Sequence, residues 1–243
     1  MKTETERRVL GGAALGVSFA VVFATALLIG WILSDLDEQR GFARWDVSAA
    51  EWGRDNATDT STRLLDIVTD LGGTMYLLVV MVALGLYVAL RHDDRRPALY
   101  LAAVGVGVTL LNNGLKLIID RDRPDIAQLA GHAGSAFPSG HTAAAAACWA
   151  AVAMVVVRHR SWTWRWVGGV VAVVIACAVA ATRVLLGVHW VSDVIAGLAV
   201  GWAWFLLVTV AFGGRILVLG HPVEPTTEPA EAPLEPVSIG DPT

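Results

Sequence analysis

Apolar runs long enough to cross a lipid bilayer recur along the 243-residue chain, and they constrain it more than any other feature. They lie at about 9–33, 71–90, 97–119, 140–157, 167–182 and 189–212, and the charged residues gather between them. A helix needs roughly 20 apolar residues to cross the hydrocarbon core, and inside lipid only helices or closed barrels satisfy their backbone hydrogen bonds. The sequence therefore predicts an all-α, polytopic membrane bundle with six transmembrane helices.

Composition divides the chain into a membrane domain and a tail. Residues 1–220 contain the six runs and form one predicted domain. Residues 221–243 hold six of the nine prolines and neither lysine nor arginine, which is typical of a disordered segment. The longest loop, 34–70, places Phe42, Trp45, Ala49 and Trp52 at helical spacing. This spacing predicts either an interfacial helix with its aromatic rings towards lipid or a helix packed as a cap over the span ends.

The basic residues between the spans predict the orientation in the membrane. With six spans, the short basic links at 91–96 and 158–165 lie on the same side as the N-terminus and Arg215. The positive-inside rule assigns that side, and with it both termini, to the cytoplasm. The ends of spans three and five and the start of span four then lie on the opposite, extracytoplasmic side.

Polar side chains that suit phosphate chemistry gather at those three places. They form three clusters: Lys116 with Arg123, Ser139 and Gly140 with His141, and Arg183 with His189 and Asp193. Arginine offers a planar fork that matches phosphate oxygens, and lysine acts as a point charge for the same group. The start of a helix adds backbone N–H donors and the positive end of its dipole. The clusters therefore predict one extracytoplasmic site for a tetrahedral oxyanion.

The two histidines divide the predicted chemistry between them. His189 and Asp193 are four residues apart, so on a helix the carboxylate orients one imidazole nitrogen and leaves the other able to attack phosphorus. His141, on the first turn of its helix, is placed to protonate the leaving oxygen. Cations and a helix terminus can neutralise the charge of a phosphoryl-transfer transition state without a metal.

We expect no metal and no cofactor. The acidic residues near the first cluster are interpreted as ion-pair partners of the neighbouring arginines rather than metal ligands; they are Asp120, Asp122 and Asp125, beside Arg121 and Arg123. No basic patch of the kind that binds nucleic acid is present in the sequence.

The three clusters together resemble the motif of the type 2 phosphatidic acid phosphatase family, which shares its active site with vanadium-dependent haloperoxidases. The resemblance covers roughly residues 60–212 and rests on Lys116, Arg123-Pro124, Pro138-Ser139-Gly140-His141, Thr182-Arg183, His189 and Asp193. It implies that His189 becomes phosphorylated, that His141 is the general acid, and that Lys116, Arg123 and Arg183 bind phosphate, with Ser139 and Gly140 completing the cradle. Two departures are Thr182, where serine is commoner, and Asp122, where many relatives have proline.

The resemblance implies an integral membrane phosphatase that acts on a lipid phosphate or diphosphate. Among its candidate substrates we favour undecaprenyl diphosphate, with phosphatidic acid and phosphatidylglycerol phosphate as the others. Two alternatives stay open: a lipid-phosphate binding or transport protein without turnover, and a lipid phosphotransferase. The expected partners are the lipid bilayer and its lipid substrate, and the oligomeric state is left open.

Overall fold

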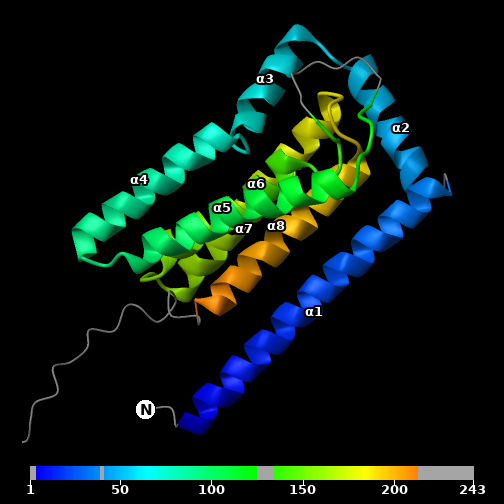
Figure 1. The fold of residues 1–243 in the computed structure, drawn as a ribbon. Helices are drawn as coiled ribbons and strands as arrows, with labels where there is room; N and C mark the ends of the chain where they lie inside the picture. The colour runs from blue at the N-terminus through cyan, green and yellow to red at the C-terminus, as the bar shows by residue number, and fades with distance from the viewer. Residues whose placement is uncertain (1–3, 39–40, 125–133, 213–243) are drawn as a thin grey trace, which may run out of the picture.

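The computed structural model describes residues 4–38, 41–124 and 134–212, and every regular element within these residues is a helix (Figure 1). The predicted tail, 221–243, lies outside the described residues. The helices are α1 (Glu4–Asp37), α2 (Gly41–Asp55), α3 (Asp59–Asp70), α4 (Thr74–His92), α5 (Arg96–Ile118), α6 (Gly140–Val157), α7 (Trp162–Leu185) and α8 (Val191–Ala211). The all-α prediction is confirmed.

Six of these helices are long and apolar enough to cross a membrane, as predicted. The spans are Gly16–Asp37, Thr74–His92, Arg96–Ile118, Gly140–Val157, Trp162–Leu185 and Val191–Ala211. The fifth begins at Trp162, before the predicted start at 167, so the second half of the basic link predicted at 158–165 belongs to the helix. The protein is therefore a multi-pass membrane protein.

The 34–70 loop folds into two short helices, α2 and α3, rather than one. Phe42 of α2 is buried, with its ring 5.1 Å from that of Trp31 on α1. Trp45 and Trp52, also on α2, are 61% and 60% exposed. One face of α2 thus packs onto the bundle and the other presents aromatic rings, whose contact with lipid stays a prediction.

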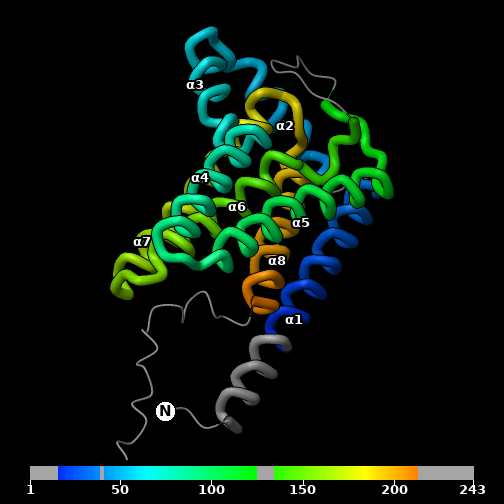
Figure 2. The backbone as a smooth tube through the Cα atoms, turned by 60° about the vertical axis from the view of Figure 1, so that its left-hand side comes forward, coloured from blue at the N-terminus to red at the C-terminus, as the bar shows by residue number. Residues whose placement is uncertain are grey.

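Chain connectivity brings the polar clusters to one end of the bundle. The helices α2 and α3 and the connections from α5 to α6 and from α7 to α8 lie at that end, and the α4–α5 and α6–α7 connections lie at the other (Figures 1 and 2). The clusters on α5, α6, α7 and α8 therefore come together, although they are far apart in the sequence.

Two glycines let α8 pack unusually close to α6. A Cβ atom at Gly201 would clash with the carbonyl oxygen of Ala143, and one at Gly197 would lie 2.7 Å from that of Ser139. Small residues permit such close approach between membrane helices. As a result the first turn of α8, which carries Asp193, lies against the start of α6, where the backbone N–H of Ser139 donates to the carbonyl oxygen of Asp193 at 3.0 Å.

Candidate active site

His189 and Asp193 form a buried hydrogen-bonded pair. His189 Nδ1 lies 3.3 Å from Asp193 Oδ2, and the same oxygen accepts the backbone N–H of Trp190 at 2.9 Å. The other imidazole nitrogen, Nε2, lies 3.3 Å from Nη1 of Arg123. Because arginine can only donate, Nε2 is the acceptor in that contact and Nδ1 carries the hydrogen that Asp193 accepts. The arrangement leaves a nucleophilic nitrogen directed at the cationic cluster.

The environment of His189 keeps its imidazole neutral. Burial lowers the pKa of His189 to about 4; its hydrogen bond to Asp193 and the charge of that carboxylate oppose the shift, and the charges of Arg123 and Arg183 add to it. The neutral form is the one that has a lone pair for attack. At neutral pH His189 is thus in the state that a nucleophile needs.

The three predicted cations lie close to one another and to this pair. The charges of Arg123 and Arg183 repel the charge of Lys116, and the charge of Asp193 attracts it. Burial lowers the pKa of Arg123, and Asp193 opposes that shift. Three cations gathered around one carboxylate repel one another, and a bound anion relieves the repulsion. The electrostatics of the cluster therefore favour an anionic ligand.

Each cation is held by the surrounding backbone or by a neighbouring side chain. Lys116 Nζ donates to the carbonyl oxygen of Ser135 at 2.6 Å, and Arg123 Nη1 to that of Val188 at 2.8 Å. Arg183 is only 4% exposed, and its Nη1 donates to Thr69 Oγ1 of α3 at 3.1 Å. Its buried Nε has no hydrogen-bond partner among the described residues. An unpaired buried guanidinium N–H costs free energy, and a phosphate oxygen would satisfy it.

The start of α6 supplies the remaining predicted groups, with one difference from expectation. Ser139 is fully buried, and its backbone N–H is already bonded to Asp193, so it is not available to a ligand. The N–H groups of Gly140 and His141 belong to the first turn, where a helix offers them no carbonyl partner. A Cβ atom at Gly140 would lie 3.2 Å from Nδ2 of Asn112. The phosphate cradle is therefore expected to use the N–H groups that follow Ser139.

His141 completes the cluster from the first turn of α6. The positive charges of Arg183, Lys116 and Arg123 all reach its imidazole. The structure thus brings together all eight residues that the sequence predicts for the site. Within the described part of the chain, no group of three or more His, Cys, Asp or Glu side chains is placed to hold a metal ion.

Sequence reasoning missed two residues that touch this site, Arg121 and Asp46. Arg121 was interpreted as a partner of its acidic neighbours, but it forms ion pairs with Asp46 at 2.8 Å and with Asp193. Asp46 lies in the 34–70 loop, where the aromatic spacing predicts a helix but gives no indication of a buried carboxylate.

Comparison with known proteins agrees with the site and the fold. Residues 96–216 match the PAP2 superfamily model. The chain is 36% identical to phosphatidylglycerophosphatase B of Bacillus subtilis over 143 residues, which cover 58% of this chain and 70% of the relative. It is 33% identical to a lipid A 1-phosphatase of Rhizobium johnstonii over 188 residues, covering 67% of this chain and 72% of the relative.

A solved structure also resembles the fold of this chain. The crystal structure of a transmembrane PAP2-type phosphatidylglycerolphosphate phosphatase from Bacillus subtilis matches with a TM-score of 0.73 and 27% identity, covering 82% of this chain and 96% of the other. The fold and the site thus define an integral membrane phosphatase. The chain belongs to the PAP2 superfamily.

The burial of His189 predicts how it responds to acid. In the folded protein its imidazole should stay neutral until the pH approaches about 4, whereas the ordinary value is 6.5. The unfolded state then binds the proton more readily, so the free energy of unfolding should fall as the pH is lowered from 6.5 towards 4. Imidazole ¹⁵N NMR in detergent micelles, with the His189 signal assigned by its loss in His189→Gln, measures this titration. A midpoint at 6.5 or above would contradict the buried, neutral state.

Proposed function

We propose that the protein hydrolyses a membrane lipid phosphate or diphosphate through a phosphohistidine intermediate, without a metal. The observation that carries the proposal is the buried His189–Asp193 pair beside three cations, one of which has a buried N–H with no partner in the described part of the chain. A protein that only binds phosphate needs the cations. It does not need a neutral histidine oriented by a carboxylate.

The proposed reaction proceeds in two displacements at phosphorus. The lone pair of His189 Nε2 attacks, the bond from phosphorus to the lipid oxygen breaks, and His141 gives that oxygen a proton. Asp193 stabilises the positive charge that develops on the imidazole, while Lys116, Arg123 and Arg183 neutralise the phosphoryl oxygens. Water then attacks the phosphohistidine, gives a proton to His141, and releases inorganic phosphate. Losing one such preorganised donor typically costs about 100- to 1000-fold in rate.

We propose that the substrate is a lipid whose phosphate enters the site from the membrane. The relatives named above act, by their names, on phosphatidylglycerophosphate and on lipid A. Among the candidates that the family resemblance offers we favour undecaprenyl diphosphate, because recycling of a carrier lipid suits a site that faces outwards. All present the same chemistry, a terminal phosphate on an apolar anchor. The lining between spans, rather than the phosphate site, would discriminate among them.

We further propose that the site faces the extracytoplasmic side of the cell membrane, with both termini in the cytoplasm. The support is the positive-inside rule applied to the basic links at 91–96 and 158–165, at the opposite end of the bundle from the site. Polyprenyl carrier lipids and phospholipids of the outer leaflet could then reach the site laterally, and water from the aqueous side.

Substitution of His189 tests the enzyme directly. Purified protein in EDTA should release phosphate from at least one of phosphatidylglycerol phosphate, phosphatidic acid and undecaprenyl diphosphate, compared by kcat/KM. His189→Ala should lose at least about 1000-fold in kcat, because loss of a nucleophile removes the covalent route. His92→Ala is the matched control, since His92 is exposed at the other end of the bundle, and it should keep the wild-type rate.

Other outcomes of this assay would contradict the proposal in different ways. Binding of the lipid phosphates without turnover would indicate a binding or transport protein. Disappearance of the lipid phosphate without release of inorganic phosphate would indicate transfer to another lipid. Activity that EDTA abolishes and a divalent cation restores would contradict the metal-free reaction.

Cysteine labelling tests the orientation. In a variant lacking Cys148 and Cys177, a membrane-impermeant maleimide applied to intact cells should label Thr60→Cys on α3 and leave Ser161→Cys in the α6–α7 link unlabelled until the cells are opened. Both positions are exposed and lie at opposite ends of the bundle. Labelling of Ser161→Cys alone in intact cells would reverse the proposed orientation.

A further inference from the structure

Asp46 is a buried carboxylate that lies on α2, outside the three clusters, yet reaches the first turn of α8. It is 2% exposed. Its Oδ1 accepts the backbone N–H of Ser192 at 2.9 Å, and its Oδ2 accepts the Ser192 hydroxyl at 2.6 Å. A carboxylate at a helix N-terminus satisfies donors that the helix leaves unpaired and interacts favourably with its dipole. Asp46 therefore caps the N-terminus of α8 from a different helix. The residue that it contacts, Ser192, directly precedes Asp193.

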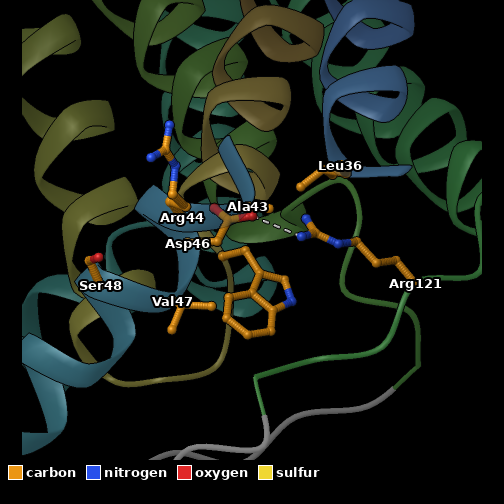
Figure 3. A pocket seen from close by; sticks show the side chains of 8 residues that line it. Leu36, Ala43, Arg44, Asp46, Val47, Ser48 and Arg121 are labelled. Atoms are coloured by element: carbon orange, nitrogen blue, oxygen red, sulfur yellow. Dashed lines mark hydrogen bonds and ion pairs between the residues drawn. The ribbon is translucent and has the colours of Figure 1, made fainter. Parts of the chain in front are cut away.

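Arg121 connects Asp46 to the catalytic carboxylate. Its Nη2 donates to Asp46 Oδ2 at 2.8 Å (Figure 3), and its Nη1 donates both to Ser192 Oγ at 2.7 Å and to Asp193 Oδ1. The two oxygens of Asp193 are thus divided: Oδ2 accepts from His189 and Trp190, and Oδ1 accepts from Arg121. One guanidinium holds two buried carboxylates at the same time.

We propose that Asp46, acting through Arg121, is a positioning residue for the Asp193–His189 pair. The inference rests on the proposed phosphohistidine reaction and extends it to α2. Because Arg121 shares its charge with Asp46, Asp193 keeps negative charge for the imidazole during attack on phosphorus. Without the charge of Asp46, Arg121 would interact more strongly with Asp193 and weaken its hold on His189.

Asp46 and Arg121 are not among the side chains proposed to bind phosphate. Asp46 and Arg121 line a cavity of about 670 Å³ beside α2, together with Arg44 and Trp190. Arg121 lies with its guanidinium 5.5 Å from the centre of the Trp190 ring. The cations proposed to bind phosphate are three other side chains. Loss of the Asp46 charge should therefore act on the chemical step more than on lipid binding.

The test compares Asp46→Asn with a matched substitution on the same helix. Asparagine keeps the size of the side chain and an oxygen for the Ser192 N–H but removes the charge. We expect kcat to fall about 10- to 100-fold, the range seen when a metal ligand loses its outer partner, and KM to change less than about 2-fold. Asp55→Asn, which breaks the exposed ion pair with Arg54, should keep the wild-type kcat.

Variants of Arg121 keep the proposal testable if Asp46→Asn folds poorly. Arg121→Lys retains the charge without the fork, so its kcat should lie between those of wild type and Arg121→Gln. Because both residues act through one chain of contacts, Asp46→Asn combined with Arg121→Gln should lose little more than Arg121→Gln alone.

The kinetic readout distinguishes positioning from a purely structural role. An Asp46→Asn protein with a lower unfolding temperature but wild-type kcat per folded molecule would overturn the proposal, as would a change confined to KM. If wild type is active and His189→Ala is not, such a result overturns the role of Asp46 alone. If wild type releases no phosphate from any lipid, the proposed function itself is overturned.

Discussion

The side chain of Asp193 is the point on which the site depends. It is fully buried, and a buried carboxylate is tolerated only when its oxygens are paired. His189 Nδ1, the Trp190 N–H and Arg121 contact those oxygens, while its backbone carbonyl accepts from Ser139. These contacts join α8, the start of α6 and the segment after α5, and through Asp46 they reach α2. The contacts that pair the charge of Asp193 therefore join segments that are distant in the sequence.

The cationic cluster holds like charges close together. Lys116, Arg123 and Arg183 are held near each other by backbone carbonyls and by Thr69, so their mutual repulsion is maintained in the folded protein. Their positions are set before any ligand arrives, which is the condition for strong electrostatic stabilisation of a transition state. In the proposed reaction the neutral His189 supplies the nucleophile, and the three cations neutralise the charge of the phosphoryl group.

The sequence predicted the parts of this structure that are encoded locally. Apolar runs of bilayer length identified six spans, and motif spacing identified eight residues that the fold brings together. The contact between Asp46 and Arg121 was not predicted because it joins residues 75 positions apart, and no periodicity marks a pair formed by packing. The division of 34–70 into two helices was also missed. The start of α3 is marked by a capping box in which Thr58 and Ser61 exchange hydrogen bonds. This pattern is short, and the prediction for the loop used the aromatic spacing of α2 instead.

Direct detection of the covalent intermediate tests the central claim. Wild-type protein mixed with a ³²P-labelled lipid phosphate and quenched in alkali, where phosphohistidine survives, should carry acid-labile label, and mass spectrometry should place it on His189. A phosphorylated His189 is the result that the account predicts. Turnover without a phosphoenzyme, or label on a residue other than His189, would contradict it.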